Sequence, residues 1–341
     1  MKILVTGGLG YIGSHTVFEL IKNGHEVVII DNLSNSSEDV LKALNQLTGR
    51  YLTFYPVDIL DVPALTNVFE KESTIDGVIH FAAKKSVSES LEKPVYYYDN
   101  NISGVINLMK MIDRYGLKYF VFSSSCTVYG QPETVPVTEE TDLVKSPTPY
   151  GNSKIISEMI LDEYTTLRPD LSTVMLRYFN PVGAHESTLI GELPLGIPSN
   201  LMPFITQTAA GWREKLKVFG SDYDTRDGTA IRDYIHVVDL ADAHVKALEW
   251  MADKSNVVEY FNIGTGNGHT VLEVVNSFEK TTGVKLNYEL VDRRPGDIEQ
   301  IWADTTKGEK VLGWKASRSL DDMTQSAWNW QKGLLYSKEK K

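Results

Sequence analysis

The 341-residue sequence is poor in several features that define other protein classes. It has a single cysteine, Cys126, which leaves no internal disulfide or cysteine-rich metal site and fits a reducing compartment. Its seven histidines are scattered, so no metal is expected. No run approaches the roughly 20 apolar residues of a membrane span, and no leader with a cleavage site precedes the first apolar stretch. We therefore expect a cytoplasmic protein with no membrane partner.

Basic residues are also in the minority. The chain has 34 Lys and Arg against 45 Asp and Glu, which gives a net charge of -11. A phosphate backbone demands a basic face, so this balance argues against nucleic acid as the main partner. A small anionic ligand stays open, because a few local arginines suffice to bind one.

The first 125 residues alternate between short apolar segments and longer amphipathic segments. This order, with strands that are apolar throughout, predicts a parallel sheet covered by helices on both faces. The expected strands are Lys2–Thr6, Glu26–Asp31, Leu52–Val57, Gly77–Phe81 and Tyr119–Ser123, and the expected helices lie near Ile12–Asn23, Asp39–Leu47, Val62–Lys71 and Ile102–Tyr115.

A further helix is expected from Tyr150 to about Leu167, before Arg168-Pro169. Its apolar residues form two stripes. One stripe should cover the sheet. The other either joins the core as well or packs on a second subunit, and the second of these alternatives predicts a homodimer. The stripes are Ile155/Met159 and Ile156/Ile160/Tyr164/Leu167.

Proline and glycine become frequent after Asn180, so we place a domain boundary there. Residues 1–180 are expected to form an α/β domain with a Rossmann-like, doubly wound parallel sheet, to which an apolar strand at Ser172–Arg177 returns. A further sheet strand is expected at Val257–Ile263, in the second half of the chain. Residues 181–341 are expected to form a smaller, mixed α/β substrate domain, with some segments crossing back to the first.

A dinucleotide site is predicted at the first strand–helix turn, where Gly7, Gly10 and Gly13 let the backbone approach a pyrophosphate. The next strand ends in Asp31, whose carboxylate can accept both hydroxyls of an adenosine ribose. Residues 32–37 include no Arg or Lys to hold a 2′-phosphate, which favours NAD over NADP. The alternatives are a plain turn and, for Asp31, a solvated carboxylate.

Three later positions extend this predicted site. Asp58 is placed to meet the adenine amino group, although it could instead cap a helix near Val62. Phe81 and Ala82 close the fourth strand, where a cofactor must pass close to the backbone. Lys85 follows on the ligand side of the sheet rather than being only a surface charge.

The chemistry is predicted to centre on Tyr150 and Lys154, which lie one helical turn apart behind Ser123-Ser124-Ser125. A nearby ammonium favours the phenolate, so Lys154 is expected to lower the pKa of the Tyr150 phenol. Tyrosine could then exchange protons near neutral pH. Beside a bound nicotinamide, such a pair can oxidise an alcohol.

From Lys2 to about Trp330 the chain resembles the extended short-chain dehydrogenase/reductase family, and most closely its UDP-glucose 4-epimerase (UDP-galactose 4-epimerase) branch. Each motif is modest alone, but their order is specific. The motifs begin at Thr6 (TGGLGYIGSH), Val78 (VIHFAA), Tyr97 (YYDNN), Ser123 (SSSCTVYG), Tyr150 (YGNSK), Leu176 (LRYFNPVGA), Asn200 (NLMP), Arg232 (RDYIHVVD) and Arg293 (RRPGD).

The resemblance implies an NAD-dependent inversion of the sugar C4 through a transient 4-keto sugar. Tyr150 would remove the C4 hydroxyl proton, Lys154 would assist it and hold the nicotinamide ribose, and Ser125 would bond O4. The resemblance adds the cofactor contacts Tyr11, Ile12, Asn32, Asn35, Ser36, Ile59, Ala82, Lys85, Asn100 and Tyr178. It places Lys85, Asn180, Asn200, Leu201, Phe219, Arg232, Tyr234, Arg294 and Asp297 on the UDP-sugar. Open alternatives are a salt bridge of Arg232 to Asp233 or Asp239, and core packing of Phe219.

One departure bears on the substrate. Relatives confined to unmodified hexoses have a tyrosine in the sugar pocket where this chain has Ile301, so we expect UDP-N-acetylglucosamine and UDP-N-acetylgalactosamine to be accepted too. The rival activities are a 4,6-dehydratase and a simple dehydrogenase, and an NAD-sensing protein is a non-catalytic rival. Dehydratases place an Asp-Glu pair where Cys126 and Thr127 stand here, and a sensor tends to lose Tyr150 or Lys154.

Overall fold

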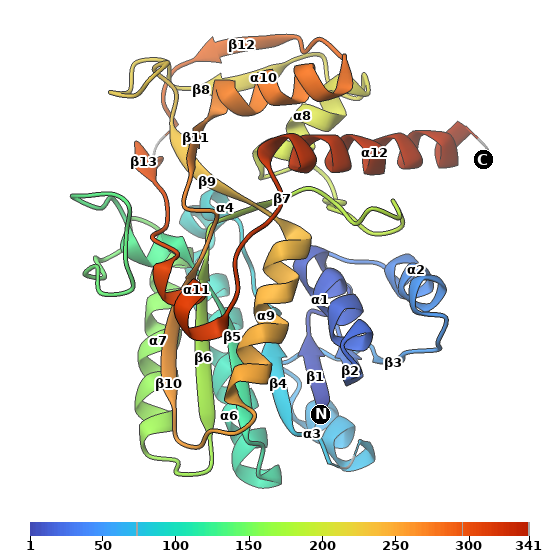
Figure 1. Cartoon of the computed structure of the whole chain (residues 1–341). Helices are drawn as coiled ribbons and strands as arrows, with labels where there is room; N and C mark the ends of the chain where they lie inside the picture. The colour runs from blue at the N-terminus through green and yellow to red at the C-terminus, as the bar shows by residue number, and fades with distance from the viewer. Residues whose placement is uncertain (73, 295, 340–341) are drawn as a thin grey trace.

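The structure, a computed structural model, describes residues 1–72, 74–294 and 296–339. Its centre is a seven-stranded parallel sheet in the order β10-β6-β5-β4-β1-β2-β3 (Figure 1). The order runs outward in both directions from β1 and β4, as in a doubly wound sheet. The strands are β1 (Lys2–Thr6), β2 (Glu26–Ile30), β3 (Thr53–Tyr55), β4 (Gly77–His80), β5 (Tyr119–Ser125), β6 (Ser172–Tyr178) and β10 (Val258–Ile263).

Helices cover both faces of this sheet because successive strand residues point to opposite sides. Ile3 and Val5 of β1 belong to one buried cluster, and Leu4 belongs to the other. The first cluster is covered by α1 (Tyr11–Lys22), α2 (Glu38–Thr48) and α9 (Val237–Met251), and the second by α3 (Val62–Lys71), α6 (Gly104–Tyr115) and α7 (Pro149–Thr166).

Short elements lie between β4 and α6 and after β5. They are α4 (Val87–Glu92), α5 (Pro94–Tyr98), a π-helix (Asp99–Ser103) and a 3-10 helix (Cys126–Tyr129).

All but one of the remaining elements form a smaller part above the carboxyl end of β1 (Figure 1). In it, β9 pairs with β11, β13 and β7, and β8 pairs with β12. These sheets and helices enclose a core of their own. The elements are β7 (Asn180–Val182), α8 (Leu201–Ala209), β8 (Leu216–Phe219), β9 (Ile231–His236), β11 (Gly268–Thr270), α10 (Val271–Thr282), β12 (Tyr288–Val291), β13 (Gln300–Ile301) and α12 (Leu320–Glu339). The short α11 (Thr306–Leu312) lies instead beside β10 and α9 at the large sheet.

The expected fold class is confirmed, and the structure identifies which later segments return to the large sheet. After β9 the chain crosses back as α9, which packs on α1, and as β10, which pairs with β6. The division of the chain at residue 180 stays a prediction. Among the described helices, none combines the length and apolar character that crossing a membrane requires.

One expectation about α7 is wrong. Its buried face is formed by Tyr150, Lys154, Ser157, Glu158 and Leu161 rather than by an apolar stripe. Neither stripe is fully buried, although Ile155 and Tyr164 each pack against a core cluster. Met159 is 64% exposed, whereas the three isoleucines are half-buried. Beneath α7 the sheet presents the Ser123 carbonyl to Lys154 and the side chains of Ser124 and Arg177 to Glu158, so a polar helix face is the one that matches it.

Candidate active site

The predicted catalytic residues come together where β5 and α7 meet. Pro149 begins α7 and the Thr148 hydroxyl accepts from the Gly151 N–H, so Tyr150 lies in the first turn. Tyr150 is 7% exposed and Lys154 is 4% exposed. The Lys154 ammonium donates to the Ser123 carbonyl at 2.6 Å.

Ser125 ends β5 and is buried beside these two residues. Its hydroxyl oxygen accepts from the Thr127 hydroxyl at 3.0 Å and from the Thr127 N–H at 3.3 Å. A side-chain interaction links Ser125 to the Tyr150 phenol. The structure therefore brings the three predicted catalytic side chains together on two neighbouring elements.

The expected lowering of the Tyr150 pKa does not occur in the protein alone. Burial raises the pKa of Tyr150 well above its ordinary value, nearby Tyr178 adds to the rise, and only the interaction with Ser125 opposes them. Burial also lowers the pKa of Lys154 to about 8, against Glu158, which raises it. Desolvation is therefore the largest influence on the pKa of both groups in the protein alone.

The glycine-rich turn has the shape that a close-approaching ligand needs. Gly7 has a φ of +65°, and a Cβ there would lie 2.9 Å from the Ala82 N. A Cβ on Gly13 would lie 2.2 Å from the Gly7 carbonyl oxygen. Gly10 precedes α1 without a capping side chain, so the first N–H groups of α1 stay available to an anion. This cradle fits the pyrophosphate of a dinucleotide.

Asp31 is a buried residue of this cradle rather than a solvated carboxylate. One oxygen accepts from the Leu9 N–H at 3.1 Å, and the other accepts from the Leu33 N–H at 2.9 Å and the Ser36 hydroxyl at 2.8 Å. It therefore holds the glycine-rich turn and the following loop, which includes the exposed Asn35, in one arrangement.

Asp58 is not the cap of the helix at Val62, because Asp61 has that role through the Ala64 N–H. The Asp58 carboxylate instead accepts from the Leu60 N–H and from the Asn32 amide, the latter at 2.8 Å. It thus joins the loops after β2 and β3 on the adenosine side of the cradle.

The remaining predicted cofactor residues border the same end of the sheet. The Ala82 N–H donates to the Thr6 hydroxyl, and Tyr178 is the register partner of Ser125. The Tyr11 hydroxyl reaches the Gly183 carbonyl at 2.6 Å, which ties the cradle to the second part of the chain. Three further residues are at least half-buried in the clusters that flank the sheet, and they are Ile12, Ile59 and Phe81.

Asn100 lies buried in the π-helix beside Asn101, a residue that the sequence analysis missed. Asn101 donates to the Lys84 carbonyl and the Ser153 hydroxyl, both at 3.0 Å, and its oxygen accepts from the Lys84 N–H. It therefore fastens the loop that bears Lys85 to α7. Its neighbour Asn100 was the only available signal.

On the predicted nucleotide side, Arg232 makes neither of the salt bridges considered for it. Its guanidinium donates to the carbonyls of Ile231 and Ile298 at 2.8 and 2.7 Å. Asp233 instead accepts from Thr265, and Asp239 pairs with Arg318. Among the residues that the structure describes, Arg232 therefore bonds backbone carbonyls and forms no ion pair with a carboxylate.

Phe219 ends β8 with 37% of its surface exposed, so it is not a core residue. The Arg294 guanidinium lies 5.4 Å above its ring and also pairs with Asp297 at 2.8 Å. An exposed aromatic face next to a cation suits a flat heterocycle with a phosphate.

The other predicted substrate residues lie on one small sheet and one helix end. Asn180 pairs with Tyr234, and Ile301 pairs with Arg232. Tyr234 packs in the core of the second part, and Ile301 is 1% exposed beside Val137 and Ala303. Asn200 precedes α8, and Leu201 is the first residue of that helix.

Glu192 was also missed, although it connects two predicted substrate residues. One of its oxygens accepts from the Asn200 amide at 2.7 Å and from the Lys85 ammonium at 3.2 Å. Lys85 belongs to the first part of the chain and Asn200 to the second. No motif distinguishes this glutamate in the sequence, because long-range contact alone defines its position.

Comparisons with known proteins agree with this geometry. The family model described as GDP-mannose 4,6 dehydratase matches residues 4–327. The UDP-glucose 4-epimerase of Bacillus subtilis (strain 168) is 52% identical over 331 residues, which cover 97% of this chain and 97% of that protein.

Solved structures extend the likeness to the whole fold. The UDP-glucose-4-epimerase from Stenotrophomonas maltophila, with bound NAD and formylated UDP-arabinopyranose, has a TM-score of 0.96 and 47% identity, and the match covers 99% of each chain. The UDP-Glc/GlcNAc 4-epimerase from Campylobacter jejuni has a TM-score of 0.83 and 37% identity, with 97% of this chain and 99% of that chain covered.

Proposed function

The chain belongs to the UDP-glucose 4-epimerase family, and from this premise we infer that it interconverts UDP-glucose and UDP-galactose with NAD as its cofactor. The observation that carries the inference is the buried group of Tyr150, Lys154 and Ser125 beside a glycine cradle shaped for a dinucleotide. Neither part alone specifies the reaction, but together they place a proton-transferring phenol next to a redox cofactor.

The cofactor is held, in our proposal, by the cradle of Gly7 and Gly13 at its pyrophosphate and by Asp31 at its adenosine ribose. Bound there, NAD supplies a hydride acceptor and donor for the sugar C4. The Ala82 backbone lies so close to Gly7 that a Cβ on Gly7 would be 2.9 Å from the Ala82 N. The buried position of Lys154 suits a bond from its ammonium to the nicotinamide ribose.

Tyr150 takes the proton of the C4 hydroxyl and later returns it to the opposite face of the sugar. Because burial opposes its ionisation, the phenol needs positive charge nearby, and Lys154 supplies one such charge. Ser125 stands within reach of Tyr150 and bonds the same sugar oxygen. A proton-transferring group of this kind typically contributes about 100- to 10,000-fold in rate.

The UDP part must stay bound while the 4-keto sugar rotates and presents its opposite face to the nicotinamide. We propose that Arg232 and Arg294 hold the diphosphate and that Phe219 covers the uracil. Their charge and exposure support these roles, since guanidinium groups suit diphosphate oxygens. Asn180, Asn200, Tyr234 and Asp297 complete the proposed UDP site.

A 4,6-dehydratase is the rival suggested by the description of the matching family model. That reaction needs acidic groups to remove water, whereas the residues after Ser125 here are Cys126 and Thr127. Burial raises the pKa of the Cys126 thiol to about 12, so it has no acid–base function near neutral pH. The local chemistry favours the epimerase.

Acetamido sugars are proposed as additional substrates. Ile301 belongs to a cluster with Val128 and Phe179, and these follow Ser125 and precede Asn180 in the chain. An isoleucine next to the sugar leaves room that a tyrosine would fill. The Campylobacter jejuni relative, described as acting on both UDP-Glc and UDP-GlcNAc, supports the idea.

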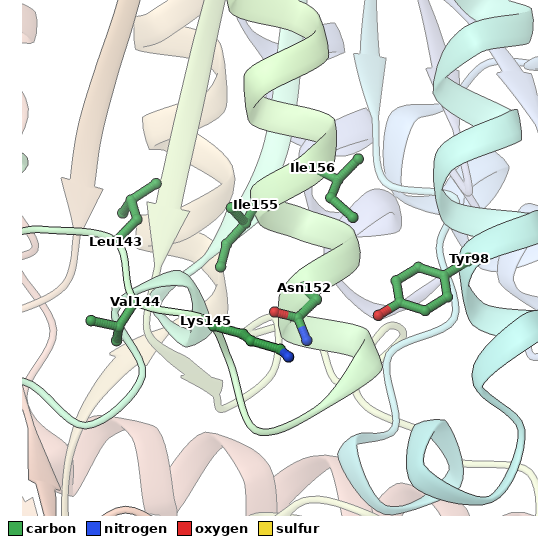
Figure 2. Close-up of a pocket in the computed structure, with 7 residues that line it drawn as sticks. All are labelled: Tyr98, Leu143, Val144, Lys145, Asn152, Ile155 and Ile156. Atoms are coloured by element: carbon green, nitrogen blue, oxygen red, sulfur yellow. The ribbon is translucent and has the colours of Figure 1, made fainter.

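A homodimer is proposed through the outward face of α7. Met159 is 64% exposed, and one turn earlier on the same helix Ile155 and Ile156 line a surface hollow of about 350 Å³. Figure 2 shows Ile155 directed toward the side of Leu143 and Ile156 toward Tyr98. An apolar helix face of this kind suits a second copy. We also propose a cytoplasmic location, which the free thiol of Cys126 supports.

The function is tested by incubating purified protein, without added cofactor, with each of the four UDP-sugars and analysing the products. The expected result is a mixture of C4 isomers from UDP-glucose and from UDP-galactose. Release of NADH with a stable keto sugar would instead identify a dehydrogenase, and loss of water would identify a dehydratase.

A further inference from the structure

The buried face of α7 contains a carboxylate that the mechanism so far leaves unused. Glu158 lies one helical turn after Lys154, and its side chain is 2% exposed. One of its oxygens accepts from the Ser124 hydroxyl at 2.5 Å and from the Arg177 Nε at 3.1 Å, and the other accepts from the Arg177 Nη2 at 2.8 Å. Glu158 is therefore fully bonded to two strands of the sheet.

Arg177 is held equally firmly from its other side. Its Nη1 donates to the Tyr129 hydroxyl and to the Glu139 carbonyl, both at 3.1 Å. A buried ion pair of this kind gains little net stability over apolar packing, because both charges lose their hydration. Stability alone therefore gives a weak reason for placing these two charges beneath the active site.

The position of Ser124 links the ion pair to catalysis. Ser124 stands between Ser123, whose carbonyl accepts from Lys154, and Ser125, the predicted sugar contact. Glu158 therefore hydrogen-bonds to Ser124, the middle residue of the segment 123–125. The residues on either side of Ser124 are the ones that contact Lys154 and, as predicted, the sugar. The same helix face presents Tyr150, Lys154 and Glu158 in successive turns.

The side chains around the Lys154 ammonium determine whether it keeps its proton. His80 faces it from β4, and burial keeps that ring neutral by lowering its pKa to about 3. The Phe122 ring lies 4.7 Å away on β5, Tyr150 and Glu158 share its helix, and Arg177 and Tyr178 lie on β6. Within this described set Glu158 is the anionic side chain, and it favours the charged form of Lys154 against burial.

We propose that Glu158 is a positioning residue of the active site, which keeps Lys154 protonated and holds the Ser123–Ser125 segment against α7. The inference rests on the proposed roles of Tyr150 and Lys154. Without this negative charge, Lys154 would lose its proton at a lower pH, and Tyr150 would lose the positive charge that supports its ionisation.

The test removes the charge while keeping a hydrogen-bond acceptor for Ser124, in Glu158→Gln. Since Arg177 is then buried without an anion, the double variant Glu158→Gln/Arg177→Met removes both charges. Titration of Lys154 is followed by nuclear magnetic resonance of lysine labelled at Cε, in protein free of substrate, with Lys154→Met identifying the signal. The matched control is Glu163→Gln, which removes a charge from an exposed position of the same helix.

We expect the titration midpoint of Lys154 to fall by about one pH unit or more in Glu158→Gln. The fall should be smaller in the double variant, because the positive charge of Arg177 is lost together with the negative charge of Glu158. The alkaline limb of kcat/KM should move with it, with about tenfold lower activity there and little change in KM. Glu163→Gln should match the wild type in both measurements.

A midpoint that is the same in wild type and variants would overturn the proposal, and so would variants that fail to fold, since the pair would then be structural only. Wild-type turnover of UDP-galactose is measured in parallel. An inactive wild type would defeat the proposed reaction, whereas the Lys154 titration in substrate-free protein decides the role of Glu158 separately.

Discussion

Lys154 and Ser123 are joined by a hydrogen bond of 2.6 Å from the lysine ammonium to the serine carbonyl. This contact ties α7 to β5 at the residues that we assign to catalysis. It also orients a lysine that is 4% exposed and therefore has little freedom to move.

Replacing this lysine should impair the chemical step more than substrate binding. In Lys154→Met we expect kcat for UDP-galactose to fall by at least about 100-fold, because proton transfer by Tyr150 loses its supporting charge. The KM should change by less than about threefold, since the UDP anchor is elsewhere. Lys280→Met, at an exposed lysine that pairs with Asp321 on the far helix α12, is the control. A normal kcat in Lys154→Met would contradict the assignment.

The glycine cradle predicts a cofactor-free variant. A Cβ at position 13 would lie 2.2 Å from the Gly7 carbonyl oxygen, so Gly13→Ala must distort the turn on which the pyrophosphate rests. We expect the purified variant to contain far less NAD than wild type, as measured after acid extraction. In Gly333→Ala the nearest atom is 3.8 Å from the new Cβ, and the NAD content should be normal. Full NAD retention in Gly13→Ala would show that the cofactor binds elsewhere.

The proposed breadth of substrate depends on Ile301. Ile301→Tyr should abolish turnover of the acetamido sugars and preserve turnover of UDP-glucose and UDP-galactose. Because Ile301 is 1% exposed, the larger ring also risks overpacking, so the melting temperature is recorded for each variant. Ile301→Leu keeps the volume and should retain all four activities. If wild type fails to invert acetamido sugars, the hypothesis is wrong.

Buried histidines predict a loss of stability in mild acid. Burial lowers the pKa of His15 and His80 to about 3 and that of His236 and His244 to about 4, from an ordinary value of 6.5. The unfolded chain therefore binds more protons below pH 6.5. Stability is fully present above that pH and falls as the pH drops toward the folded values, by about 1.4 kcal/mol per pH unit for each histidine.

Melting temperatures between pH 7.5 and 5 measure this effect. The decline should be shallower in His244→Gln than in wild type, provided the variant folds at pH 7.5. The comparison variant is His269→Gln, which replaces a partly exposed histidine beside Glu273 and leaves the four buried histidines in place. Equal slopes in wild type and His244→Gln would contradict the argument.

Much of the fold was predictable because the strands of the large sheet are short apolar runs between turn signals. Even Val258–Ile263, far along the chain, was expected as a sheet strand. The short α4, α5 and π-helix before α6 were not, since elements of five or six residues show too little periodicity.

The site was predictable where local motifs define it and not where distant contacts do. The glycine turn, Asp31 and the pair of Tyr150 and Lys154 could be identified from spacing. The orientation of α7 could not, because apolar periodicity assumes an apolar partner and this helix covers polar strand residues instead. Glu192 joins Lys85 to Asn200 across the two parts of the chain, and no local pattern reports such a contact.

The central claim is that the Tyr150 phenol transfers the proton at the sugar C4. It is tested most directly by the turnover of UDP-galactose in Tyr150→Phe, with NAD content verified and Tyr164→Phe on the same helix as control. We expect Tyr150→Phe to retain its fold and NAD and to lose about 1,000-fold in kcat, whereas Tyr164→Phe stays near wild type. Turnover by Tyr150→Phe at the wild-type rate would contradict the mechanism.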